Sequence, residues 1–177
     1  MVVREKQKGF IMLELLLFLA LILLFSAQAL PAMFKFYRQV AVEFEAEYLL
    51  TDIRRCQSLS RTIAEPAWGY GAKDLRRRYA RLDLFPGGNR ITAGGAYIIE
   101  RHLYLPGIQV AKLDEQQDYI AGDDKIQVGF RADGSPQLTE GMITLLIFFG
   151  GYEQEGCRIM VSKGGRIRME RDNHEKK

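Results

Sequence analysis

The chain has 177 residues, 47% of them hydrophobic and 27% charged, with a formal net charge of +3. This balance excludes a largely disordered chain and fits one domain with an extension. The two histidines, His102 and His174, are isolated and the two cysteines, Cys56 and Cys157, are far apart, so we expect no metal site and no cofactor.

The first predicted element is an apolar segment, residues 10–34, in which Glu14 is the only ionisable residue. About 20 apolar residues are enough for a helix to cross a bilayer. We therefore predict a transmembrane helix. The preceding stretch MVVREKQKG carries more cations than carboxylates. The positive-inside rule then keeps this end in the cytoplasm and the bulk of the chain outside it.

Three interpretations of the apolar segment stay open. The first is a plain signal anchor. The second is a cleaved secretory signal, because Ala-Gln-Ala at 27–29 resembles the small-residue cleavage pattern. The third interpretation explains Glu14, since a carboxylate in lipid is costly and usually has a functional partner. Cleavage between Gly9 and Phe10 would create an ammonium group at Phe10, which Glu14 of a neighbouring subunit would neutralise.

Gly9-Phe10 followed by an apolar stretch with Glu14 resembles the leader of type IV pilins and pseudopilins. Pro31 lies where these proteins commonly carry a helix-weakening proline. The resemblance implies that residues 1–9 are a leader removed by a prepilin peptidase. It further implies N-methylation of Phe10, and roles for Glu14 and Pro31 in assembly with other subunits.

The next predicted element is an amphipathic helix over residues 35–65. Residues at spacings of three and four form its apolar face, namely Val42, Ala46, Leu49, Ile53, Cys56, Ser60 and Ile63. Charged residues mostly occupy the rest of the surface, including Glu43, Glu45, Glu47, Asp52 and Arg55. Pro66 ends the pattern. Together with the membrane segment, this predicts one nearly continuous helix, loosened at Pro31.

From residue 66 to residue 177 the pattern changes to short segments rich in Val, Ile, Tyr and Phe, separated by Gly, Pro and Asp turns. They predict strands at 79–85, 96–105, 108–113, 125–130, 142–149 and 157–162, the last forming a hairpin with 166–170. We therefore expect an α+β fold, in which the long N-terminal helix packs on an antiparallel β-sheet head.

This head contains no catalytic motif, and we do not expect an enzyme. The acidic pairs 114–115 and 123–124 lack the spacing of a calcium loop and are interpreted as solvated loop residues. Cys56 and Cys157 would both lie outside the cytoplasm, where a disulfide can persist. Two buried free thiols are the default interpretation, and a disulfide between helix and sheet is the alternative.

A second resemblance covers the head. LLTDIRRCQSLSRTIAE is similar to the helix of GspH/FimT-type minor pseudopilins, and residues 125–171 resemble that group and the competence minor pseudopilins of Gram-positive bacteria. The resemblance implies a minor subunit of an extracytoplasmic filament that serves type II secretion, type IV pili or DNA uptake. The alternative is a secreted or membrane-anchored β-rich binding module with an ordinary signal sequence.

The C-terminal segment is basic, with seven Lys or Arg residues from Cys157 onward. Arg166 and Arg168 would point to the same side of a strand and would meet successive DNA phosphates, with Arg171 as a further contact. FimT-type pilins involved in DNA uptake carry a similar G-R-x-R sequence. The alternative is a solvated edge strand whose charges block aggregation.

Overall fold

The computed structural model describes residues 3–63, 80–93, 97–113, 119–120, 126–137 and 142–171. The chain divides into two compact units, residues 1–39 and 40–177, and each is described by itself. The predicted acidic pairs at 114–115 and 123–124 lie outside the described residues, as does the end of the basic tail after Arg171.

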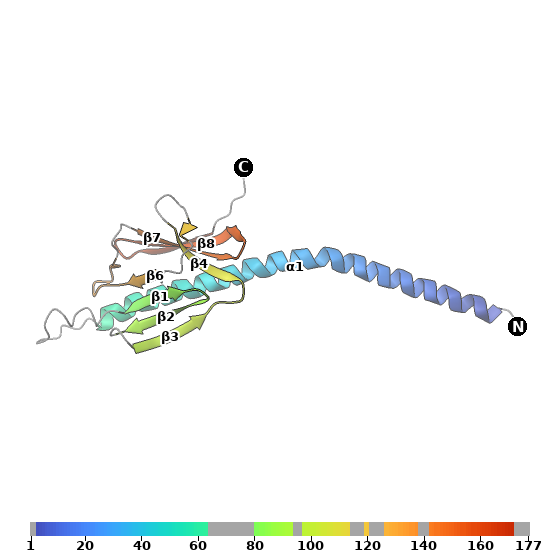
Figure 1. Cartoon of the computed structure of the whole chain (residues 1–177), viewed down its shortest axis with the longest axis horizontal. Helices are drawn as coiled ribbons and strands as arrows, with labels where there is room; N and C mark the ends of the chain where they lie inside the picture. Colours follow the sequence, from blue (N-terminus) through green and yellow to red (C-terminus); the bar gives the residue numbers. More distant parts are fainter. Residues whose placement is uncertain are drawn as a thin grey trace, which may run out of the picture. The chain divides into compact units, whose positions relative to one another are not determined.

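A single long helix, α1 (Val3–Ile63), runs through both predicted helical segments, which confirms the continuous helix (Figure 1). Pro31 lies inside it, and the helix continues on both sides of the proline. The predicted loosening at Pro31 therefore does not interrupt the helix. A proline removes one backbone hydrogen bond, and the bonds of the flanking turns remain.

Among the described residues, the strands form two antiparallel sheets. The four-stranded sheet has the order β3-β2-β1-β6, from β1 (Arg81–Phe85), β2 (Gly88–Ala93), β3 (Tyr97–Leu103) and β6 (Ile126–Gly129). The five-stranded sheet has the order β5-β4-β7-β8-β9, from β4 (Ile108–Leu113), β5 (Tyr119–Ile120), β7 (Met142–Phe149), β8 (Tyr152–Ser162) and β9 (Ile167–Arg171).

The antiparallel head is confirmed, with differences in detail. The strands form two sheets, β8 begins at Tyr152 rather than at 157, and β2 and β5 were not predicted. β2 begins within the Pro-Gly-Gly-Asn stretch at 86–89, which is a turn signal in the sequence. The turn is confined to Pro86 and Gly87, with Gly87 at a φ of 82°. Gly88 already belongs to β2, where a Cβ atom would collide with the carbonyl oxygen of His102 and the ring of Phe85. Glycine at 88 is thus needed inside a strand.

The hydrophobic core of the second unit joins α1 to both sheets. The predicted apolar face is confirmed, because Val42, Ala46, Leu49, Ile53, Cys56 and Ser60 are all buried. The side chain of Ile63 lies outside the described residues. The same core cluster contains residues of both sheets, among them Leu82, Leu84, Ile91, Val128, Leu145, Ile147, Ile159 and Val161. In Figure 1, residues 40–63 of α1 accordingly run between strands of the two sheets.

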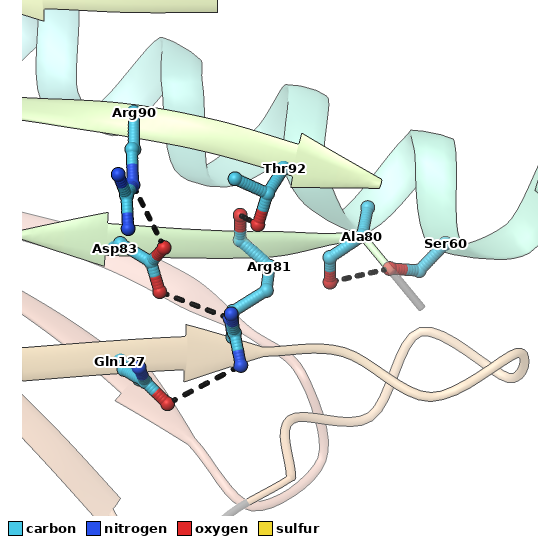
Figure 2. A network of polar contacts seen from close by, with 7 residues as sticks. All are labelled: Ser60, Ala80, Arg81, Asp83, Arg90, Thr92 and Gln127. Carbon is cyan, nitrogen blue, oxygen red and sulfur yellow. Dashed lines mark hydrogen bonds and ion pairs between the residues drawn. The ribbon is translucent and has the colours of Figure 1, made fainter. Parts of the chain in front are cut away.

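Two polar side chains near the end of α1 hold loops of the head in place. Gln57 Nε2 donates to the carbonyl oxygens of Gly134 at 2.7 Å and Gly165 at 2.9 Å. Ser60 Oγ donates to the carbonyl oxygen of Ala80 at 3.3 Å (Figure 2). Gln57 thereby fixes the hairpin turn before β9 against the helix.

Candidate functional site

The first candidate site is the exposed apolar surface of α1 between residues 10 and 36. Its large side chains are all solvent-exposed, from Phe10 at 73% to Phe36 at 68%. The helix contains an 18-residue window with a mean hydropathy of 2.7 and no buried residue. By length and composition α1 is able to cross a membrane. A surface of this kind needs either lipid or other apolar helices around it.

Glu14 lies on this apolar surface and is itself exposed. It follows Phe10 by four positions, so the two residues lie on the same face of the helix, one turn apart. In the described residues, Gly9 is part of the same helix, which begins at Val3. The structure therefore places the predicted cleavage site and Glu14 on one continuous helix.

A second group of polar residues, missed by the sequence analysis, joins the second half of α1 to β3. Glu45 is only 1% exposed, although its charge suggested the solvated face. Its carboxylate contacts His102 Nε2 at 2.8 Å and accepts a hydrogen bond from the backbone N–H of Leu105 at 2.9 Å. The ring of Tyr48 stacks on His102, with centroids 3.9 Å apart. His102 is thus not isolated in the folded protein.

Asp52 of α1 and Glu100 of β3 extend this contact between helix and sheet. Asp52 is buried, and its Oδ2 accepts a hydrogen bond from Asn89 Nδ2 at 3.0 Å. Burial raises the pKa of Asp52, partly offset by that hydrogen bond. Glu100 accepts a hydrogen bond from Tyr48 Oη at 3.2 Å and forms an ion pair with Arg55. Tyr48, Asp52, Arg55 and Glu100 each have a polar partner here, which is typical of a structural connection between helix and sheet.

The basic candidate site lies at the edge of the five-stranded sheet. Arg166 precedes β9 and Arg168 lies within it, and both are exposed, whereas Ile167 and Met169 pack against the core. This alternation places Arg166 and Arg168 on the outward face of the segment. Arg171 differs, because it approaches Glu43 of α1 at 3.7 Å. The structure therefore brings two of the three predicted arginines together on the outward face.

Cys56 and Cys157 are both buried in the core cluster. The structure does not join them by a disulfide. Burial, with the nearby carboxylates of Asp52 and Asp83, raises the pKa of Cys56 to about 12. Such a thiol stays protonated and packs as a small apolar group. Within the described ranges, no group of three or more His, Cys, Asp or Glu residues is placed to hold a metal ion.

The chain resembles known proteins in structure but not in sequence. No protein-family model and no curated protein sequence matches this chain. One crystal form of the type IV minor pilin FimU from Pseudomonas aeruginosa superimposes with a TM-score of 0.50 and 17% identity, covering 74% of this chain and 89% of FimU. A second crystal form of FimU gives a TM-score of 0.49 and 17% identity, covering 73% of this chain and 93% of FimU. The first superposition shows that the chain has a pilin-like fold.

Proposed function

We propose that this chain is a minor subunit of an extracytoplasmic type IV-like filament. The observation that carries the proposal is the apolar surface of α1 at residues 10–36, in which Glu14 is the single carboxylate and every large side chain is exposed. Lipid covers this surface before assembly, and helices of sister subunits cover it in the filament. The pilin-like fold shared with FimU, itself a type IV minor pilin, supports the proposal.

In this proposal, a prepilin peptidase cleaves the bond between Gly9 and Phe10. Phe10 then becomes the N-terminal residue and is N-methylated, and Glu14 pairs with the N-terminal amine of the adjacent subunit. The protein is single-pass in the cytoplasmic membrane with residues 40–177 outside the cytoplasm. It is afterwards extracted into a periplasmic or cell-surface filament. Pro31 makes extraction easier by weakening the helix locally.

The first prediction is a change of mass on processing. The membrane-bound form should begin at Phe10 and carry one methyl group, because the peptidase removes residues 1–9. Intact-mass analysis of the purified membrane form, with and without a co-expressed prepilin peptidase, measures this change. Gly9→Leu should block the cleavage, whereas Gly150→Ala, outside the leader, should not. A mature chain that begins at Leu30 would instead establish a secretory signal.

The alternative function is a membrane-anchored or secreted β-rich binding module with an ordinary signal sequence. Crosslinking in the membrane separates the two, because a filament subunit should crosslink through residues 10–34 to other pilin-like chains. A binding module would show ligand affinity without sister subunits. Glu14 in the exposed apolar helix favours the filament, because a carboxylate in lipid is costly and a membrane anchor alone gives it no partner.

For the cargo of the filament, we propose DNA uptake ahead of type II protein secretion. Arg166 and Arg168 support this choice, because both are exposed and lie on one side of an edge segment that Gln57 fixes against α1. Two adjacent guanidinium groups suit successive phosphates of a duplex. Contacts of this kind are independent of base sequence and weaken as salt displaces them.

The second prediction concerns this basic edge. The full chain in detergent micelles should bind duplex DNA at low ionic strength, with little sequence preference. Removing two phosphate contacts should reduce the slope of log affinity against log salt by about 2. A salt titration of the Arg166→Gln/Arg168→Gln double variant measures this reduction. The matched control is Arg54→Gln/Arg131→Gln, which changes two exposed arginines outside β9, one in α1 and one after β6. Absence of binding at low salt, or an unchanged slope, would leave the arginines as edge-protecting charges.

A further inference from the structure

The outward face of the four-stranded sheet carries more cations than carboxylates. Asp83, Arg90 and Arg101 are directly opposite one another across β1, β2 and β3. Asp83 is 1% exposed and is shared by two arginines, with Oδ1 2.9 Å from Arg81 Nε and Oδ2 3.0 Å from Arg90 Nε (Figure 2). One buried carboxylate therefore serves two guanidinium groups, and the same row across the sheet carries a third.

Arg101 is that third guanidinium group. It is exposed and lies over the ring of Phe85, with its Cζ 5.4 Å from the ring centroid. Within the part of the chain that the structure describes, no carboxylate lies within ion-pair distance of Arg101. A cleft of about 170 Å³ opens beside it, lined by Asp83, Leu84, Phe85, Arg90, Ile98 and Arg101. The cleft thus combines apolar walls with an arginine suited to a carboxylate.

The strand beside this cleft also has an open edge. Among the described residues, β3 pairs with β2 alone, so its other edge has no strand partner. Four of its side chains are large, apolar and exposed: Tyr97 at 78%, Ile98 at 58%, Ile99 at 41% and Leu103 at 63%. Proteins usually protect an open strand edge with charges or prolines. β3 carries Glu100, Arg101 and His102 in its middle, but four exposed apolar side chains on one open strand are typical of a surface that another chain covers.

We propose that β3 and the adjoining cleft bind an extended acidic–apolar segment of a partner protein, which adds to the sheet as a further strand. Backbone groups along the edge of β3 would supply the hydrogen bonds of strand addition. A carboxylate opposite Arg101 would enter the cleft. Apolar side chains two positions before and after it would lie near Ile98 and Leu103. The register shift between Ile98 and Glu100 brings Ile98 to the side of Arg101, where both line the cleft.

This site is separate from the apolar surface of residues 10–36 and from the arginines around β9. It does not depend on the filament role. The partner is defined by its chemistry, an apolar–x–acidic–x–apolar sequence in an extended conformation. The partner needs an acidic residue because Arg81 and Arg90 pair with the carboxylate of Asp83, which leaves Arg101 as the arginine that a partner's carboxylate can contact.

A peptide titration tests the proposal. The probe is the capped peptide Thr-Val-Thr-Glu-Thr-Val-Thr, labelled for fluorescence anisotropy and added to the full chain in detergent micelles. It should bind about fivefold more tightly than the same peptide with Gln in place of Glu, as one partly screened charge pair predicts. A peptide with prolines at its second and sixth positions should not bind, because proline lacks the backbone donor needed for strand pairing.

Arg101→Gln should remove the preference for the acidic peptide. Arg168→Gln should keep it, since Arg168 is an equally exposed arginine on the edge strand β9 of the other sheet. Unchanged far-UV circular dichroism shows that both variants are folded. Equal affinity for the two peptides, retained preference in Arg101→Gln, or absence of binding would overturn the proposal. A concentration-dependent dimer that Arg101→Gln dissociates would also overturn it, in favour of a second copy as the occupant.

Discussion

Replacing Glu14 with Gln is expected to reduce incorporation of the subunit into filaments by about thirtyfold. An unpaired charged side chain within a transmembrane helix costs about 2.5–3.5 kcal/mol of insertion free energy. Pairing with the amine of an adjacent subunit recovers most of this free energy. Loss of about 2 kcal/mol of this pairing corresponds to the thirtyfold change. Quantitative immunoblotting of sheared filaments, normalised to the membrane pool, measures it.

Membrane insertion and processing serve as internal controls for this substitution. Gln is less costly in lipid than Glu, so insertion of the variant should be at least as efficient. Gln28→Ala, which also changes a polar residue in the apolar segment but leaves Glu14 intact, should be incorporated normally. Full incorporation of Glu14→Gln would contradict the pairing role, and would turn attention to packing between helices alone.

Replacing Glu45 with Ala is expected to destabilise the head by about 2–4 kcal/mol, the range for a buried acceptor that leaves its partners unsatisfied and a cavity behind. The variant removes the acceptor for the backbone N–H of Leu105 and the partner of His102 Nε2, two partly buried contacts between α1 and the end of β3. Urea unfolding of the full chain, followed by far-UV circular dichroism, measures this loss of stability as a shift in the midpoint.

Glu47→Ala is the matched control, because Glu47 lies two positions along the same helix and is exposed. It should change the free energy of unfolding by less than about 0.5 kcal/mol. Glu45→Gln keeps an acceptor oxygen for Leu105 and should fall between the two. If Glu45→Ala and Glu47→Ala destabilise equally, the contact of Glu45 with His102 and Leu105 contributes nothing to the stability of the head.

Local patterns along the chain were sufficient to predict the helix and its buried face. Val42, Leu49 and Ile53 recur at helical spacing, and all three are buried. The apolar segment 10–34 was recognisable from its length and from its single carboxylate. Most strands were also predictable, because β-branched and aromatic residues between Gly and Pro turns give the same signal in any antiparallel sheet.

Only the tertiary structure decided which polar residues of the helix are buried. Glu45 and Asp52 look solvated in the sequence, yet they are buried because His102, Leu105 and Asn89 come from the sheet to meet them. The same holds for the row of Asp83, Arg90 and Arg101, which strand pairing alone brings together. Burial of a polar side chain depends on partners that are distant in the chain, whereas helical and strand periodicity depends on neighbours. The sequence by itself therefore determined the elements and the apolar face of the helix, and folding determined the polar contacts and the open edge of β3.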